Sequence, residues 1–568
     1  MDKPERKAAF IILILGFMVF FSILSNGFVY DDVAQISNNP LVHSLLNLPY
    51  FFLGGTFFDA GTQQLISVFY RPILSTVFAF LYTFSGGYPF LFHLFQVLLH
   101  CANALLVFLL FRKFFKEKVS LFFAILFLIH PINQEAVAYI SDLQENLFFF
   151  FGVLTFFVSD SNLKITLRVL FINVFLLLGL LSKETAILFV PTLIVYNFFF
   201  QKKNINKTFF ISIFTTLALY FYLYFYVGHV AKITDAVAPI MKASLFERML
   251  TMPAIVFYYL KTFFFPNTLA LGNAWVVKKP SFTNFYLPLI GDGIFFSFMG
   301  FGGLSFWKKN KEAFYIYIYF VCWFVFGIAM HMQLIPLDMT VADRWFYFPI
   351  VGLLGLFATI CYFGRWQKKV GRWNLLLIGS AVILLLAWRT MMRNTNWVDT
   401  LTLCRHDLQI IPDAYNVQSV CGSQLLQANR YEESKQYFAV AAQLAPNYSF
   451  NWYQYGISYE YTGDLTKARE YYNKSIQLSN EVNAYVSLAA TYLKYEHDPQ
   501  KAKQIVEDGL KSYPNYQRLQ LYLAVCEYKL NNKQSALEIA TKANQLSPSP
   551  ESQYVLNQIL NDKDVALN

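Results

Sequence analysis

The sequence predicts an all-α protein in two parts: a polytopic bundle of about eleven membrane-spanning helices, followed by a solenoid of paired helices. Of the 568 residues, 56% are hydrophobic and only 14% are charged, a composition unlike that of a soluble chain. Apolar runs long enough to cross a bilayer recur up to residue 394. From residue 412 onward the sequence instead repeats with a period of about 34 residues.

The membrane part is predicted from its apolar runs, each near the length that a spanning helix needs. Two further segments, 64–85 and 250–266, are weaker candidates, and we expect 250–266 to be re-entrant or interfacial because an additional span would reverse the orientation of the tail. The eleven runs lie near 8–28, 88–111, 119–137, 143–158, 165–181, 185–200, 208–228, 284–306, 313–331, 345–363 and 374–394.

Charge predicts the orientation of the chain. Residues 1–395 carry 30 basic and 17 acidic groups, whereas residues 396–568 carry 15 and 18. The basic residues form no contiguous stripe, which argues against a nucleic-acid partner. Many of them lie in short loops that fall on the cytoplasmic side if the N-terminus is cytoplasmic, and an odd number of spans then places the tail outside. These loops are 112–118, 201–207, 307–312 and 364–372.

The C-terminal part shows the signature of a tetratricopeptide repeat (TPR) array. Small residues recur at fixed points of each unit and allow paired helices to approach closely. We expect a membrane domain over 1–395, a linker over 396–411 and a TPR domain over 412–568, with four repeats and a capping helix near 550–561. The concave groove of such an array suits an extended peptide. A purely structural superhelix is the alternative, because tyrosines such as Tyr453, Tyr455, Tyr459, Tyr485 and Tyr492 also suit packing.

Asp31 and Asp32 close the first predicted span on the predicted outer side. Adjacent carboxylates raise the pKa values of one another, and one of them can act as a general base that takes a proton from an acceptor hydroxyl. An acidic loop cap is the alternative. Neither carboxylate is preferred as the base by the sequence.

Three cations share the same predicted face: Arg71, Lys183 and Arg344. A phosphate-bearing ligand fits them, since Arg binds phosphate by bidentate hydrogen bonds and Lys binds it as a point charge. The alternative is that these side chains extend toward lipid headgroups.

Four more polar residues have supporting roles in this prediction: His130, Glu135, Glu184 and Asp343. They are placed to orient a reacting group, although helix capping explains some of them equally well. A histidine with a carboxylate can also hold a cation, but no complete ligand set is visible. We therefore expect no resident metal or other cofactor, with a divalent cation as the minority alternative.

In their order and spacing, these motifs resemble the transmembrane and TPR-containing O-mannosyltransferases (TMTC), members of the GT-C superfamily of polytopic glycosyltransferases. The resemblance covers nearly the whole chain. One departure is Ser141-Asp142, where the family usually has Gly-Arg. The matching stretches are 28–40, Tyr70-Arg71-Pro72-Ile73, Phe92-His93 with Leu99-His100, His130-Pro131 with Glu135-Ala136-Val137-Ala138, Leu181-Ser182-Lys183-Glu184, and Asp343-Arg344 with Tyr347-Phe348-Pro349.

The resemblance implies a GT-C fold, a polyprenyl-phosphate-linked sugar as donor, and transfer of mannose or another hexose to Ser or Thr hydroxyls of extracytoplasmic proteins. It places the catalytic acid in the first outer loop, at Asp31 or Asp32. It also implies membrane lipid and an acceptor protein in the TPR groove as partners. The compact membrane part and the four repeats resemble a prokaryotic relative in a bacterial inner membrane.

Two alternatives remain open from the sequence. One is a GT-C transferase that acts on a surface glycan or lipid. The other is a non-catalytic TPR membrane scaffold for envelope or pilus assembly. The charged residues of the predicted outer face argue against the scaffold, because such groups are costly at a membrane unless they have a function.

Overall fold

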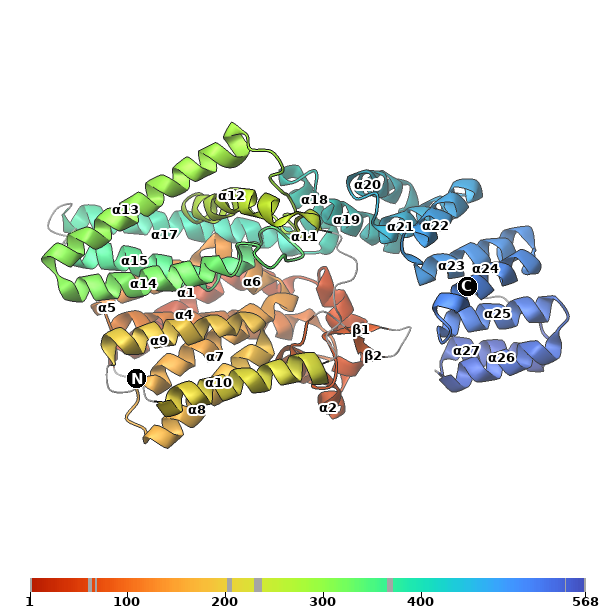
Figure 1. Cartoon of the computed structure of the whole chain (residues 1–568), viewed down its shortest axis with the longest axis horizontal. Coiled ribbons are helices and arrows are strands. Elements are labelled where there is room, and N and C mark those ends of the chain that lie inside the picture. The colour runs from red at the N-terminus through yellow and green to blue at the C-terminus, as the bar shows by residue number, and fades with distance from the viewer. Residues whose placement is uncertain are drawn as a thin grey trace. The chain divides into compact units, whose positions relative to one another are not determined.

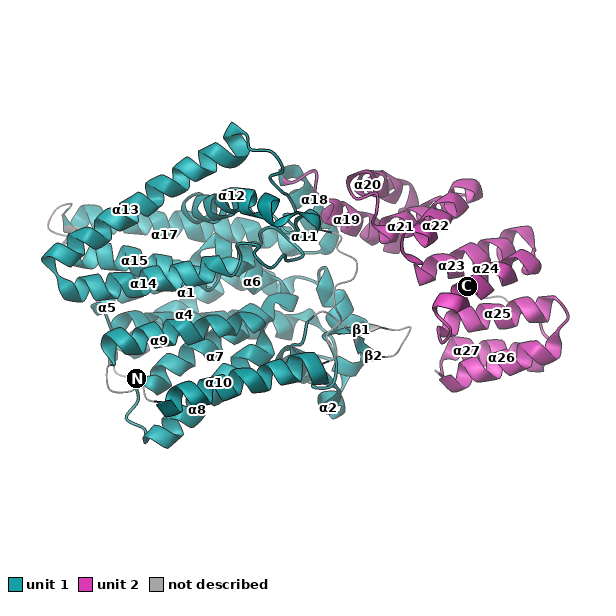
Figure 2. Ribbon diagram, viewed as in Figure 1, with its two compact units in different colours: residues 1–58, 65–410 teal, residues 59–64, 411–568 magenta. Residues whose placement is uncertain are grey.

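The computed structural model describes residues 3–59, 64–66, 69–201, 207–228, 238–364, 371–546 and 548–565. The chain divides into two compact units (Figure 2). The first comprises residues 1–58 and 65–410, and the second comprises residues 411–568 together with 59–64. Each unit is described by itself.

The first unit is a helical bundle (Figure 1). Its only strands among the described residues are β1 (Phe57–Asp59) and β2 (Gln64–Ile66), which pair with each other. Its α-helices are α1 (Lys3–Phe20), α2 (Leu48–Phe51), α3 (Pro72–Ser85), α4 (Pro89–Arg112), α5 (Glu117–Ile129), α6 (Glu135–Ala138), α7 (Leu143–Ser159), α8 (Ile165–Ser182), α9 (Phe189–Phe200), α10 (Lys207–Tyr222), α11 (Pro239–Lys242), α12 (Leu245–Phe264), α13 (Leu287–Lys309), α14 (Lys311–Ala329), α15 (Pro349–Phe363), α17 (Arg372–Asn394) and α18 (Thr400–Ile410).

Short 3-10 and π turns join these helices. They are η1 (Phe21–Ser25), η2 (Val33–Ser37), η3 (Pro40–His43), η4 (Leu45–Asn47), η5 (Pro131–Asn133), η6 (Ile140–Asp142), η7 (Glu184–Leu188), η8 (Leu223–Val227), η9 (Phe282–Tyr286), η10 (Asp343–Phe346) and η11 (Thr395–Trp397).

Seven helices of the described chain are long and apolar enough to cross a membrane, and each corresponds to one of the eleven predicted runs. The other four runs form shorter helices: α5 with 13 residues, α7 with 17, η7 with α9, and α15 with 15. Proline explains two of the shorter lengths, because α5 stops just before Pro131 and α15 begins at Pro349. The polar turns η5 and η10 take the place of the missing helical turns.

The two weaker candidates are not full spans. Segment 64–85 contains β2 and the 14-residue helix α3. Segment 250–266 falls largely in α12, a helix of 20 residues that is not among the seven candidate spans. Its side chains Tyr258 and Tyr259 bond to residues 342 and 343, so that α12 packs beside η10.

The residues that flank the four predicted cytoplasmic loops lie at one end of the bundle, while residues 202–206 and 365–370 of these loops lie outside the described part of the chain. Their flanking aromatic rings contact one another: Phe114 with Phe200 at 5.1 Å and Phe115 with Tyr362 at 5.8 Å between ring centroids. Phe306 contacts Phe363 at 6.5 Å. The compartment that this end faces remains a prediction.

The opposite end is the one where α1 and η1 finish, and we call it the site end. Here Gly27 N–H donates to the carbonyl of Val398 at 3.0 Å, and Asn26 donates to the carbonyl of Asn394 at 3.5 Å. The end of α17 is thereby tied to the end of α1.

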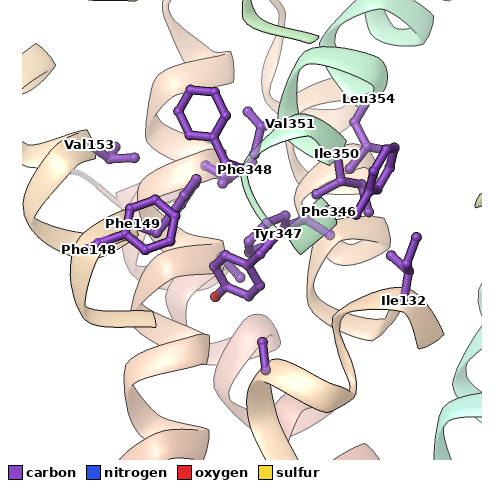
Figure 3. Close-up of a cluster of buried hydrophobic side chains, with 14 of the residues drawn as sticks. Ile132, Phe148, Phe149, Val153, Phe346, Tyr347, Phe348, Ile350, Val351 and Leu354 are labelled. Atoms are coloured by element: carbon purple, nitrogen blue, oxygen red, sulfur yellow. The ribbon is translucent and has the colours of Figure 1, made fainter. Parts of the chain in front are cut away.

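The Tyr347 hydroxyl is the centre of a buried polar junction. The Tyr347 ring lies among apolar side chains that include Phe148 and Phe149 (Figure 3). Its hydroxyl donates to Asn146 Oδ1 at 2.8 Å, accepts from Asn103 Nδ2 at 3.1 Å and lies 2.8 Å from His100 Nδ1. Such bonds hold helices together where lipid provides no hydrophobic driving force, and here they join α4, α7 and α15.

The second unit is the predicted repeat array. Four helix pairs and a final helix follow one another. They are α19 (Tyr415–Gln427), α20 (Tyr431–Leu444), α21 (Ser449–Tyr461), α22 (Leu465–Ser479), α23 (Val482–Thr491), α24 (Pro499–Ser512), α25 (Gln517–Lys529), α26 (Lys533–Leu546) and α27 (Pro550–Leu560), with the turn η12 (Tyr492–Glu496) between α23 and α24.

The small residues of the repeat allow its paired helices to approach closely, as the pattern predicts. A Cβ on Gly422 would meet the Phe438 ring at 2.8 Å, and one on Gly456 would meet the Tyr472 ring at 2.6 Å. The helices of each of these pairs therefore approach too closely for a side chain at that position.

The tyrosines considered for the groove take part in packing. Tyr455 stacks on Tyr471 with centroids 4.6 Å apart, and Tyr459 lies against both rings. Tyr453 contacts Tyr472. In the third repeat, Tyr485 is buried and Tyr492 lies under the cations of Arg469 and Lys501.

The predicted linker, 396–411, is mostly helical. Residues 395–397 form η11 and residues 400–410 form α18. Thr400 and Asp407 of this segment bond to the site end, through Tyr30 N–H and Leu271 N–H. The division between the units falls after residue 410.

We expect Tyr347→Phe to lower the free energy of unfolding by about 1–2 kcal/mol, because the Asn146 and Asn103 amides each lose a buried partner. Thermal unfolding of the purified protein in detergent measures this change. Tyr50→Phe, at an exposed ring, is the matched control. Equal melting temperatures for the two variants would show that the hydroxyl does not hold the bundle.

Candidate functional site

The two adjacent carboxylates have different environments. Asp32 is fully buried and accepts hydrogen bonds from Val29 N–H at 3.0 Å, Ser141 N–H at 2.6 Å and the Ser141 hydroxyl at 2.7 Å. The Asp31 side chain is exposed, and its backbone N–H donates to the Tyr139 hydroxyl at 3.1 Å. Asp32 therefore joins the segment between η1 and η2 to η6, while Asp31 is left accessible.

Burial favours the protonated form of the Asp32 carboxyl. It raises the pKa of Asp32 to about 7, although the three donors favour the ionised form. Desolvation raises the pKa of Asp31 as well, against the Tyr139 hydroxyl and the positive charge of Arg344, which both lower it. The accessible carboxylate thus lies within the electrostatic reach of a predicted phosphate-binding cation.

Arg71 is held by two side chains. Its Nε and Nη2 donate to the two carboxylate oxygens of Glu184 at 3.2 and 2.7 Å, and its Nη1 donates to Gln144 Oε1 at 2.6 Å. The guanidinium also lies over the Phe69 ring, 4.1 Å from its centroid. This clamp fixes the plane of the guanidinium.

The other two predicted cations are paired in the same way. Lys183 forms a buried ion pair with Glu145. Arg344 pairs with Glu135 through its side chain and donates to it through its backbone N–H at 3.2 Å, and its Nε lies 3.4 Å from Asp142 Oδ1. All three cations therefore have carboxylate partners, and the contacts bring η5–η6, α7, η7 and η10 together.

Two of the supporting residues serve the local fold. His130 accepts from Ile132 N–H at 3.2 Å through Nδ1, and its Nε2 lies 3.0 Å from the Phe263 carbonyl, so both ring nitrogens are used. Asp343 accepts from the Tyr258 hydroxyl at 2.7 Å. Burial, reinforced by the negative charge of Glu135, raises the pKa of Asp343 to about 8.

Sequence reasoning missed residues that carry no motif. Tyr139 and Gln144 bond to Asp31 and Arg71 but lie in ordinary apolar or polar context. The buried pair of Arg393 with Asp407, at 2.7 Å, joins α17 to α18 and has no recognisable spacing. His331 is a lone histidine after α14. No group of three or more His, Cys, Asp or Glu side chains in the described ranges is arranged to hold a metal ion.

Known proteins resemble both parts of the chain. A tetratricopeptide repeat model matches residues 449–481, which contain α21 and α22. The human protein O-mannosyl-transferase TMTC3 is 23% identical over 94% of this chain and 64% of its own length. The Drosophila melanogaster protein O-mannosyl-transferase Tmtc1 is 32% identical over 30% of this chain and 20% of its own length. Over most of its length, the chain is similar to proteins named TMTC O-mannosyl-transferases.

The match to TMTC3 extends through both units, but the chain spans less than two thirds of that relative's length. Among solved structures, the TPR protein YrrB is 14% identical, with a TM-score of 0.24 over 28% of this chain and 82% of its own. The resemblance to the TMTC family that the motifs predict is confirmed by the relatives that match over most of the chain.

Asp31→Asn and Asp32→Asn should differ in stability. We expect Asp32→Asn to cost about 2–3 kcal/mol, because an amide cannot accept from all three donors that surround Asp32. Asp31→Asn should leave the melting temperature within about 1 °C. Thermal unfolding of the two purified variants checks this, and an unchanged Asp32→Asn protein would contradict the anchoring role.

Stability should fall as the pH rises. A carboxyl with a raised folded-state pKa binds its proton more tightly when folded, so its contribution is complete below the unfolded pKa, near 4, and declines until the folded pKa is passed. For Asp343 this window extends from about pH 4 to about 8. Asp343→Asn, which mimics the protonated form, should flatten the melting-temperature profile there, whereas Asp338→Asn, at an exposed side chain, should not.

Proposed function

We propose that this protein is a GT-C glycosyltransferase that moves mannose or another hexose from a polyprenyl phosphate to Ser or Thr hydroxyls of extracytoplasmic proteins. Similarity over most of the chain to relatives named protein O-mannosyl-transferases supports the reaction class. The observation that carries the assignment is the accessible Asp31 carboxylate, set on the buried Asp32 anchor beside Arg344.

Asp31 is the proposed general base. A base must reach the proton that it removes, and of the two carboxylates only Asp31 is exposed. Asp32 has its oxygens engaged by three donors and acts as the positioning residue that holds the loop. The acceptor hydroxyl gives its proton to Asp31 and attacks the anomeric carbon as the bond to the lipid phosphate breaks, so one displacement inverts the sugar.

Arg71, Lys183 and Arg344 are the proposed phosphate contacts. The ion pairs leave some donors for a phosphate. Arg71, for example, uses three of its five N–H groups in hydrogen bonds to Glu184 and Gln144. The carboxylates hold each cation in place and offset part of its charge. A lipid phosphate then meets preorganised donors, and the leaving phosphate is stabilised where its charge develops.

The TPR unit is proposed to dock the acceptor protein. The tyrosines of the second and third repeats are engaged in packing, so docking falls to other residues of the array. The chain enters the array from α18, whose residues bond to the site end of the first unit. We place the site end and the array on the extracytoplasmic side of a bacterial inner membrane, in accord with the basic loops at the opposite end.

The test is intact-mass analysis of extracytoplasmic proteins from cells with the wild-type protein, with none, and with Asp31→Asn. We expect a hexose-sized mass to be present with the wild type and missing from the other two. Glu312→Gln, at an exposed carboxylate of the opposite end of the bundle, is the matched control and should keep the modification.

Other outcomes separate the alternatives. Full modification with Asp31→Asn removes Asp31 as the base. Unmodified proteins with altered surface glycans move the acceptor to a glycan or lipid, and no change in either class favours a scaffold.

A further inference from the structure

His331 is a buried histidine whose ring nitrogens have no hydrogen-bond partner in the described chain. It lies two residues after α14 and is 4% exposed. Both ring nitrogens are shielded from solvent, and neither makes a hydrogen bond within the described residues. An unpaired buried polar group costs about 1–3 kcal/mol, so such a group indicates that its partner is something other than this part of the chain.

The ring is held in a defined orientation. It stacks on Trp345 with centroids 4.9 Å apart and an angle of 9° between the planes. The following loop is fixed by Gln333, whose amide donates to the carbonyls of Met339 and Thr340 at 2.8 and 3.0 Å. Arg248 donates to the carbonyl of Gln333 at 2.9 Å. His331 is therefore presented by a fixed loop.

Two other buried histidines of the site end differ in this respect. His130 has both ring nitrogens in contact with backbone groups, and His100 lies between Tyr347 and the Leu128 carbonyl. Those two rings have hydrogen-bond partners in the fold. Both ring nitrogens of the buried His93 are unpaired as well, but the backbone groups of Asn26 and Gly27 act on that ring, whereas the groups that act on His331 are charged side chains.

The charged neighbours of His331 belong to the site. Lys183, Glu184 and Arg344 lie near enough for their charges to act on the ring. Burial, reinforced by Lys183 and Arg344, lowers the pKa of His331 to about 3. The ring is a neutral imidazole, with one N–H donor and one acceptor.

We propose that His331 is a fourth phosphate-contacting residue, whose N–H donates to a phosphate oxygen of the lipid-linked sugar beside Lys183 and Arg344. This inference rests on the proposed function, because it takes the polyprenyl phosphate as the ligand. Trp345 fixes the plane of the donor. A neutral donor suits this place, since a third cation beside Lys183 and Arg344 would be repelled.

The experiment measures binding of farnesyl phosphate, a short prenyl monophosphate, to the purified full-length protein by calorimetry. We expect His331→Phe, which keeps the stack on Trp345 but loses the N–H, to weaken binding about tenfold to hundredfold. His331→Gln, which restores a neutral donor, should recover most of the affinity. Met332→Leu, at the neighbouring residue, is the matched control.

Farnesol, which lacks the phosphate, distinguishes a phosphate contact of His331 from a structural role of this residue. Its binding should be unchanged in every variant. An equal loss of affinity for farnesol and farnesyl phosphate would make His331 a structural residue and overturn the proposal. So would wild-type affinity for farnesyl phosphate in His331→Phe, or no binding of farnesyl phosphate by the wild type.

Failure of the proposed function gives a different result. If extracytoplasmic proteins carry no hexose but farnesyl phosphate binding depends on His331, then the phosphate contact stands and the acceptor assignment fails. If hexose transfer depends on Asp31 but farnesyl phosphate binding does not depend on residue 331, then the proposed function stands and the phosphate contact of His331 fails.

Discussion

The site end depends on one buried carboxylate. Asp32 receives three hydrogen bonds from Val29 and Ser141, and these bonds join the loop that follows the first span to the turn that precedes α7. A buried charge or carboxyl is tolerated only when its oxygens are satisfied, so this arrangement constrains both segments at once. The accessible side chain of Asp31 and the position of Tyr139 both follow from it.

Around this anchor, the bundle is organised by paired charges. Arg71 with Glu184, Lys183 with Glu145, and Arg344 with Glu135 each join two segments that are distant in sequence. Buried pairs contribute little net stability, but loss of one partner is costly because the other is left uncompensated. The charges therefore act mainly as constraints on geometry. That role suits a site in which a lipid phosphate has to meet donors already in place.

The lengths of the helices reflect the same requirement. α5 stops just before Pro131, and α15 begins at Pro349. Each of these two helices is shorter than its apolar run, and a 3-10 segment, η5 after α5 and η10 before α15, lies at the site end instead. The apolar runs predict eleven spans, and seven helices of the described chain are long and apolar enough to span. The numbers differ because hydropathy does not show where a helix ends and a 3-10 turn begins.

The sequence by itself determined the class of fold, the repeat array and the membership of the charged motifs in one face. Hydropathy and a 34-residue period are local patterns, and each helix pair of the array is built from contacts within its own stretch of sequence. Only the tertiary structure decided which carboxylate is accessible, since Asp31 and Asp32 are chemically identical and differ only in what Ser141 does, more than a hundred residues away. It also decided that the three cations are paired, that both ring nitrogens of His130 meet backbone groups and that those of His331 make no hydrogen bond within the described residues. The physical reason is that burial and hydrogen bonding belong to neighbours in space, and a single sequence shows only neighbours along the chain.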